Sequence, residues 1–102
     1  MDGRPRLQWT TTFTPVGAVH KLQHQFGRVV RRRRLAAGLS QEALSAAAGL
    51  HRTYVGLLER GLRMPSILVA KKVAEALGTT AAGLLAEIDA EDGDRRPAKS
   101  PG

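Results

Sequence analysis

The residues with the clearest chemistry lie near the middle of the chain, where hydrogen-bond donors alternate with apolar side chains. Arg52 carries a planar guanidinium that can donate two hydrogen bonds to O6 and N7 of guanine, with a plain phosphate contact as the alternative. Thr53 can donate to a base or a phosphate, and Leu57 offers only apolar contact, which suits a thymine methyl. Arg60 and Arg63 suit phosphate contacts that do not depend on sequence. This chemistry is that of binding DNA.

Other residues in the same stretch indicate how these side chains are held. Val55 and Leu58 are three residues apart and should share one helix face, packed in the core with Leu44 and Leu50. Gly56 interrupts the same segment, although glycine inside a helix costs about 1 kcal/mol relative to alanine. Either Gly56 leaves room for DNA to come close, or it is tolerated variation at an exposed site.

The elements that must position these residues are two short helices joined by a glycine turn. Ser40 can cap a helix over about 41–48 that ends at Gly49, and a second helix over about 52–60 stops at Gly61. Two helices joined by so short a turn cannot lie antiparallel, so they should cross steeply. This is helix-turn-helix geometry, in which the second helix enters the major groove of DNA.

Three further helices should complete an all-α domain without a β-sheet of consequence. We expect a first helix that starts near 19–25 and ends at Ala37, a fourth that begins at Pro65-Ser66, and a fifth capped by Thr79 or Thr80. Apolar residues at helical spacing predict the inner stripe of the fourth helix. They are Ile67, Ala70, Val73, Ala74 and Leu77.

At 102 residues the chain should form one small domain with a tail at each end. Turn-forming residues interrupt 1–20, which we expect to be a flexible arm whose Trp9 and Phe13 could dock on the domain or on a partner. Residues 89–102 are acidic and then contain Pro, Arg and Lys, so they should be disordered. The folded domain is therefore predicted to span 21–88, and dimerisation would stabilise so small a core.

Positive charge is concentrated in the part of the chain that carries the two crossing helices. The net charge is +7; residues 1–72 hold thirteen Lys or Arg against three acidic residues, and residues 73–102 hold three against six. Such a surface attracts a polyanion, although it could also be merely a soluble basic surface. The chain has no Cys, no apolar run of about 18 residues and no signal-peptide core. We therefore expect a cytoplasmic protein without disulfides, thiolate zinc sites or a membrane span.

A series of short motifs runs through residues 26–85 in a fixed order. They are Phe26-Gly27, Val30-Arg31, Arg34, Gly38-Leu39-Ser40-Gln41, Ala48-Gly49-Leu50, Tyr54-Val55, Leu58-Glu59-Arg60-Gly61, Pro65-Ser66 and Ala74-Glu75-Ala76-Leu77-Gly78. In this order they resemble the Cro/C1-type helix-turn-helix domain of the xenobiotic-response-element (XRE) family of transcriptional regulators. The residues around His51–Tyr54 and Leu58–Gly61 are also similar to the controller proteins of restriction–modification systems. Arg33 and Ser45 depart from the family, which commonly has Leu and Ala there.

The resemblance implies a five-helix, lambda-repressor-like fold and adds roles for single residues. It implies that Gln41 contacts DNA, where a helix N-terminus would favour a phosphate; a neutral first-turn residue is the alternative. His51 occupies a cap position where the family usually has Ser or Thr, and since histidine is a poor cap we expect it to contact a phosphate or a base. Tyr54 could place its hydroxyl on a phosphate or be purely structural. In the family, Arg34 pairs with Glu59 and so fixes the second helix of the motif.

These observations predict a sequence-specific transcriptional regulator that binds double-stranded DNA. It would bind a palindromic operator as a homodimer, with 52–60 in the major groove and half-sites about 34 Å apart. The candidate dimer face is the apolar set Leu84, Leu85 and Ile88 of the fifth helix, which could instead close the core of the monomer. No cofactor and no small-molecule ligand is expected.

Two other classes of function are weighed against this prediction. His20 and His24 are four residues apart, as metal ligands can be, but no third ligand has suitable spacing. No Ser/His/Asp set, carboxylate pair or phosphate-binding glycine loop is present, so we predict neither a metal site nor an enzyme. The remaining alternative is an antitoxin or bridging coactivator whose main partner is another protein, which Trp9 and the acidic residues 87–94 would contact.

Overall fold

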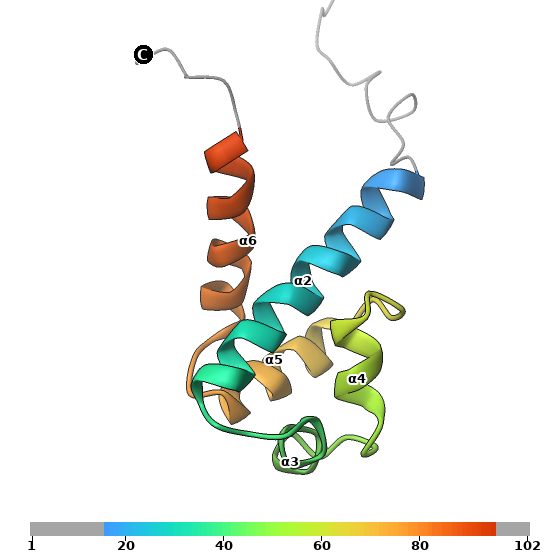
Figure 1. Ribbon diagram of the computed structural model, residues 1–102, viewed down its shortest axis with the longest axis vertical. Coiled ribbons are helices and arrows are strands. Elements are labelled where there is room, and N and C mark those ends of the chain that lie inside the picture. Colours follow the sequence, from blue (N-terminus) through green and yellow to red (C-terminus); the bar gives the residue numbers. More distant parts are fainter. Residues whose placement is uncertain (1–15, 96–102) are drawn as a thin grey trace, which may run out of the picture.

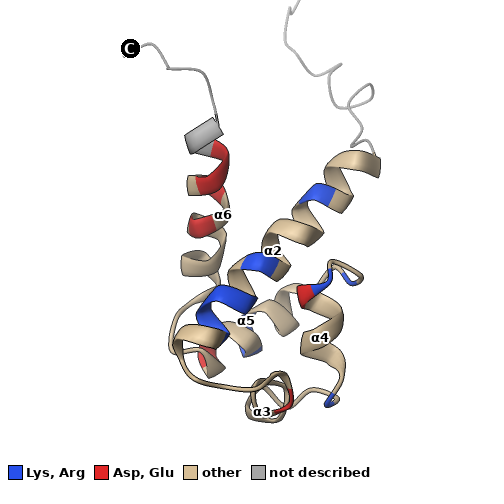
Figure 2. Cartoon of the chain, in the orientation of Figure 1, with Lys and Arg blue, Asp and Glu red and all other residues tan. Residues whose placement is uncertain are grey.

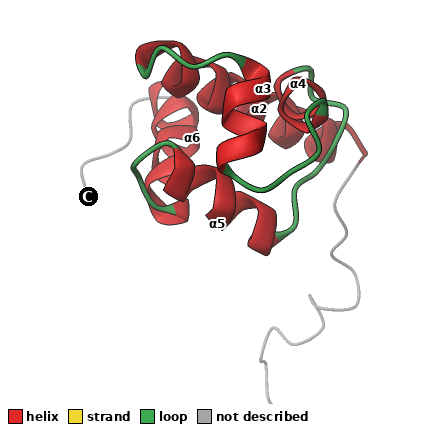
Figure 3. Ribbon diagram, turned by 90° about the horizontal axis from the view of Figure 1, so that it is seen from below, coloured by secondary structure: helices red, strands yellow, loops and turns green. Residues whose placement is uncertain are grey.

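The structure, a computed structural model, describes residues 16–95, and in this range the chain forms five helices and no strand (Figure 1, Figure 3). They are α2 (Val16–Ala36), α3 (Gln41–Ala47), α4 (Tyr54–Glu59), α5 (Ile67–Ala76) and α6 (Ala81–Arg95). The predicted all-α, five-helix fold is confirmed. In the same residues no helix has both the length and the apolar character needed to cross a membrane.

Side-chain caps and glycines set the helix boundaries. Ser40, Ser66 and Thr80 each accept a hydrogen bond from the backbone amide three residues further on, at 2.9, 3.1 and 2.9 Å, and so start α3, α5 and α6. Gly49 and Gly61 follow α3 and α4 with φ values of +72° and +74°, a conformation that L-residues rarely adopt. The turn between the two crossing helices is therefore fixed by local chemistry.

The core lies where the apolar faces of all five helices meet. Its buried side chains are Phe26, Val29, Val30, Leu44, Ala48, Val55, Leu58, Val73, Ala74, Leu84 and Ile88. Val55, Leu58 and Leu44 are fully buried and Leu50 packs partly buried against them, which confirms the predicted inner face of α4. The predicted stripe of α5 is wrong at Ile67, which is 82% exposed because it begins the helix at the edge of the core.

Helices α2 and α4 pack backbone against backbone at Gly27. Gly27 is buried in the middle of α2, and a Cβ at this position would collide with the backbone carbonyl oxygens of Leu58 and Glu59. Only glycine lets the two backbones come this near. This crossing holds α4, whose outer side carries the candidate DNA contacts, directly on the longest helix of the domain.

The structure differs from the sequence prediction at both ends of the domain and at α4. Residues 16–20 of the predicted arm are helical, whereas Trp9 and Phe13 lie outside the described residues. The helix α4 begins at Tyr54, so the residues at 52 and 53 lie in the turn before it. Residues 89–95 of the predicted disordered tail continue α6.

Ion pairs along α2 explain why α6 continues. Glu87 pairs with Arg32 and Arg33, Glu91 lies 3.0 Å from Arg28, and the amide of Gln25 donates to Asp92 at 2.9 Å. Figure 2 shows the resulting pattern, with Lys and Arg along α2 and Asp and Glu along α6. Residues 89–95 have the composition of a disordered tail, but they are helical because the acidic side chains of Glu91 and Asp92 find partners on α2.

Candidate nucleic-acid interface

The two central helices have the predicted crossed arrangement. In Figure 1 α3 is seen nearly end-on, whereas α4 lies along the plane of the picture. The start of α4 is tied to α3 by Ser45, whose buried hydroxyl accepts a hydrogen bond from the backbone amide of Val55 at 3.2 Å. An alanine, common here in the family, could not accept this bond, so the departure at Ser45 was the sequence signal for this contact.

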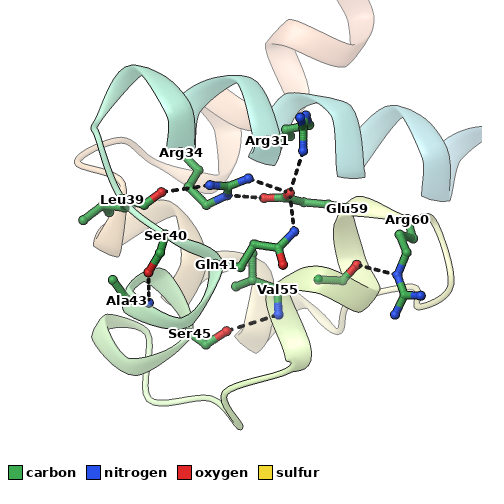
Figure 4. Close-up of polar contacts among 11 residues, drawn as sticks. Arg31, Arg34, Leu39, Ser40, Gln41, Ala43, Ser45, Val55, Glu59 and Arg60 are labelled. Carbon is green, nitrogen blue, oxygen red and sulfur yellow. Dashed lines mark hydrogen bonds and ion pairs between the residues drawn. The ribbon is translucent and has the colours of Figure 1, made fainter.

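The far end of α4 is fixed by a buried ion pair, shown in Figure 4. Arg34 donates to both carboxylate oxygens of Glu59, at 2.6 and 3.0 Å, and to the carbonyl oxygen of Leu39 at 2.8 Å. The side chains of Arg34 and Glu59 are only 8% and 3% exposed. The hydrogen bond to Glu59 raises the pKa of Arg34 above its ordinary value, against the lowering effect of burial. The pairing implied by the resemblance is confirmed.

Gln41 belongs to the same network. Its amide nitrogen donates to Glu59 at 2.9 Å, and its amide oxygen would lie 3.1 Å from a Cβ at position 56. The missing side chain of Gly56 therefore leaves room for Gln41, a role that neither interpretation from the sequence included. One amide hydrogen of Gln41 already serves the protein, so a phosphate contact through the second stays a prediction.

The four consecutive arginines of α2 pair with carboxylates on two different helices, α4 and α6. Arg32 and Arg33 face the carboxylate of Glu87, whereas Arg34 and, more distantly at 3.8 Å, Arg31 face Glu59. Arg33 therefore takes up an ionic contact with α6 at a position where the family commonly has Leu. All four charges are used within the domain, which leaves the charge available to DNA elsewhere.

The turn before α4 presents three exposed side chains, those of His51, Arg52 and Thr53. Arg52 has no hydrogen-bond or ion-pair partner among the described residues, so its guanidinium is free to contact another molecule. The N-cap residue of α4 is Thr53, which makes no side-chain cap hydrogen bond, and the Nδ1 of His51 accepts a hydrogen bond from the backbone amide of Thr53 at 3.2 Å. The ring thus orders the turn and remains exposed. The expected contact of His51 with a phosphate or a base stays a prediction.

The remaining candidate DNA contacts on α4 are partly turned inward. Tyr54 and Leu57 are half-buried, and Tyr54 packs against the core, as its structural interpretation requires. Arg60 is exposed and its Nε donates to the carbonyl oxygen of Gly56 at 3.3 Å, while Arg63 is exposed in the following loop. These positions are compatible with the predicted contacts, which stay predictions.

The predicted dimer face on α6 is wrong at two of its three positions. Leu84 is fully buried and Ile88 is 3% exposed, because both face the core of the monomer, whereas Leu85 is 52% exposed. Leu85 instead borders an apolar groove of about 180 Å³ between α2, α6 and the start of α5. Its other walls include Leu22, Phe26, Met64, Pro65 and Ile67.

The two histidines of α2 do not form part of a metal cluster in the described region. Within residues 16–92, no three His, Cys, Asp or Glu side chains come together in a way that could hold a metal ion. The ring of His24 packs on Gly61, where a Cβ would collide with it. His24 therefore supports the turn after α4, a structural role.

The fold and this geometry define a helix-turn-helix DNA-binding domain, and comparison with known proteins agrees. Residues 30–84 match the helix-turn-helix family HTH_3, so the chain belongs to this XRE-type family of transcriptional regulators, which are not enzymes.

The chain is also similar to individual proteins of this family. The chain is 43% identical over 61 residues to the control protein C.BamHI of Bacillus amyloliquefaciens, which covers 59% of this chain and 75% of that protein. It is 41% identical over 49 residues to the HTH-type transcriptional regulator YqaF of Bacillus subtilis, 48% of this chain and 64% of YqaF. The crystal structure of the restriction–modification controller protein C.AhdI from Aeromonas hydrophila has a TM-score of 0.59 at 44% identity, covering 61% and 94% of the two chains.

Proposed function

We propose that the protein binds a palindromic operator as a homodimer and regulates transcription in the manner of a controller protein. The observation that carries the proposal is the guanidinium of Arg52, which is exposed, has no partner among the described residues and precedes a helix that is anchored at both ends. Ser45 ties the start of α4 to α3, and the Arg34–Glu59 pair fixes its end. Because the backbone around Arg52 is already ordered, only its side chain would lose conformational freedom on contacting a base edge.

The distribution of unpaired charge supports the same face. The basic residues of α2 pair with carboxylates of α4 and α6. Within residues 16–92, Arg52, Arg60 and Arg63, at the two ends of α4, have no carboxylate partner. Arg60 and Arg63, at the far end of α4 from Arg52, can neutralise phosphates while Arg52 contacts a base.

Selection of bound sequences from a random pool of double-stranded DNA tests the proposal. We expect a palindromic consensus, and Arg52→Ala should cost about 1–3 kcal/mol and relax the preference at one position of each half-site. Arg63→Ala is the matched control: it should weaken all sequences about equally and lower the salt dependence. Unchanged operator affinity in the Arg52 variant would show that the assignment is wrong.

For the homodimer we propose the apolar groove as the contact, in place of the face predicted from the sequence. A two-fold dimer needs one self-complementary patch, and Leu22, Met64, Ile67 and Leu85 are 40%, 44%, 82% and 52% exposed around this groove. A contiguous apolar patch of this kind is typical of an interaction site.

Light scattering at micromolar concentration measures the association. The wild type should have the mass of a dimer, and Ile67→Glu should have the mass of a monomer. Leu35→Glu is the control, because Leu35 is 54% exposed but lies outside the groove. A monomeric wild type would rule out the dimer.

The structure weakens one support of the alternative, in which the main partner is a protein. The carboxylates of Glu87 and Glu91, which belong to the proposed acidic contact, are paired with α2. The alternative therefore rests on Asp89, which is exposed, and on the segments outside the described residues. Removing residues 1–15 and 96–102 should leave operator binding intact in a DNA-binding regulator.

A further inference from the structure

The imidazole of His51 is held in one tautomeric form by its neighbour. Its Nδ1 lies 3.2 Å from the backbone nitrogen of Thr53 and 3.0 Å from the Thr53 hydroxyl oxygen. A backbone N–H can only donate, so Nδ1 must accept and carries no hydrogen. A neutral imidazole with a bare Nδ1 carries its hydrogen on Nε2. The ring therefore presents one N–H donor.

This donor is open to another molecule. His51 and Thr53 are both exposed, and the two contacts between them are the only side-chain hydrogen bonds of either residue within the described part of the chain. The pair precedes α4 and flanks Arg52. In the docking geometry of a helix-turn-helix domain, residues at the start of the second helix meet base edges in the major groove.

We propose that His51 is a specificity-determining residue that donates its Nε2–H to an acceptor on a base edge, with Thr53 as the residue that positions it. This inference rests on the proposed function. In the major groove, guanine offers N7 and O6, adenine N7 and thymine O4, whereas cytosine offers only a donor. The base opposite His51 is therefore guanine, adenine or thymine, and cytosine is excluded on that strand.

The same geometry favours a base over a phosphate. A phosphate is bound best by the charged imidazolium, in which both ring nitrogens carry hydrogen. That form would set the Nδ1 hydrogen against the amide hydrogen of Thr53 and break the contact observed here. The neutral ring held by Thr53 is a single directional donor, which suits an uncharged acceptor.

The test compares the base preferences of wild type and His51→Ser in the random-pool selection. Serine can accept the Thr53 amide through its own hydroxyl and so keep the turn, but it lacks a donor at the reach of Nε2. We expect the discrimination against cytosine at one position of each half-site to fall roughly 3- to 10-fold, the worth of one ordinary hydrogen bond. His20→Ser, on the exposed side of α2, should leave the whole profile unchanged.

The other outcomes overturn the inference in distinguishable ways. An unchanged profile in His51→Ser removes His51 from recognition, and an equal loss over all sequences assigns it to a phosphate. If the wild type selects no sequence at all, the proposed function fails with it. A measurement that needs no variant is the ¹⁵N NMR spectrum of the wild-type imidazole: an Nδ1–H tautomer at position 51 in the free protein would contradict the arrangement directly.

Discussion

Helix α2 makes two interfaces of opposite character, one with α4 and one with α6. Against α4 it presents Gly27, apolar side chains and the Arg34–Glu59 pair, whose members are 8% and 3% exposed. Against α6 it presents a row of ion pairs that water reaches, such as Arg32–Glu87 at 54% and 25% exposure. The same run of arginines thus supplies one buried pair and several open ones.

The different exposure of the ion pairs in the two interfaces indicates which helix the fold holds more firmly. An exposed ion pair is typically worth 0–1 kcal/mol, because water and salt screen it. A buried pair adds little compared with apolar packing, but removing one partner leaves an uncompensated charge and costs about 3–5 kcal/mol. The fold therefore holds α4, beside the candidate DNA contacts, more firmly than the outer part of α6, whose contacts salt and pH can weaken.

The sharpest test of this comparison removes one arginine from each interface. Arg34→Met leaves the buried carboxylate of Glu59 without its main partner and should lower the free energy of unfolding by about 3–5 kcal/mol. Arg32→Met, two positions away and exposed, should lower it by about 1 kcal/mol at most. Urea denaturation measures both. Similar losses in the two variants would show that the interfaces do not differ as described.

Substitution of two glycines in α2 tests the backbone contact with α4. Gly27→Ala places a methyl against the carbonyl oxygens of Leu58 and Glu59, so the helices must separate, at a cost of about 3 kcal/mol. Gly17→Ala is the matched control in the same helix, because among the described residues no atom outside its own stretch of helix lies within 4 Å of the added methyl. It should be neutral or stabilise by up to about 1 kcal/mol. If Gly17→Ala also lowered the stability, the loss in Gly27→Ala could not be assigned to the contact with α4.

Acid tests the interface with α6. Burial raises the pKa of Glu87, but hydrogen bonds from Arg32 and Arg33 outweigh it, so the pKa lies below its ordinary value of 4.5. A carboxylate with a depressed pKa in the folded state stabilises the fold above its unfolded pKa and loses this contribution as pH falls through the folded value. Glu87→Gln should therefore lower the free energy of unfolding by about 1 kcal/mol at pH 7.

The pH dependence of the difference in unfolding free energy shows whether the charge of Glu87 is responsible. The gap between wild type and Glu87→Gln should shrink as pH is lowered below 4.5. Glu75→Gln, an exposed carboxylate on α5 with no ion pair among the described residues, should give no such gap. A gap that persists in acid would mean that the side chain contributes packing and not charge.

The sequence was sufficient where the signals are local. Ser40 and Ser66 cap the helices they were expected to cap or precede, and Gly49 and Gly61 end theirs, because capping depends on residues three or four apart. The partnership of Arg34 with Glu59, 25 residues away, followed only from the family resemblance.

Contacts that depend on the arrangement of distant helices could not be predicted in this way. The acidic end of α6 has the composition of a disordered tail, and the arginines that donate hydrogen bonds to it lie 54–63 residues earlier. Helical spacing shows that Leu84 and Ile88 share a face that Leu85 does not, but it does not say which face meets the core. For the same reason Gly56 could not be matched to Gln41 before the structure placed them together.

Substitution of Gly56 should change the stability least but should still weaken operator binding. Alanine at this position should stabilise α4 by up to about 1 kcal/mol through helix propensity. Its methyl would lie 3.1 Å from the amide oxygen of Gln41, which must therefore shift and weaken its hydrogen bond to Glu59. We expect Gly56→Ala to melt no lower than the wild type and yet to bind the operator more weakly.

The double variant Gly56→Ala with Gln41→Ala should show no further loss of operator affinity beyond that of Gln41→Ala alone, because both changes act through one side chain. If instead the two losses of operator affinity add, Gly56→Ala does not act through Gln41. Gly56 would then face the DNA itself, and it would not belong to the network of Arg34, Glu59 and Gln41.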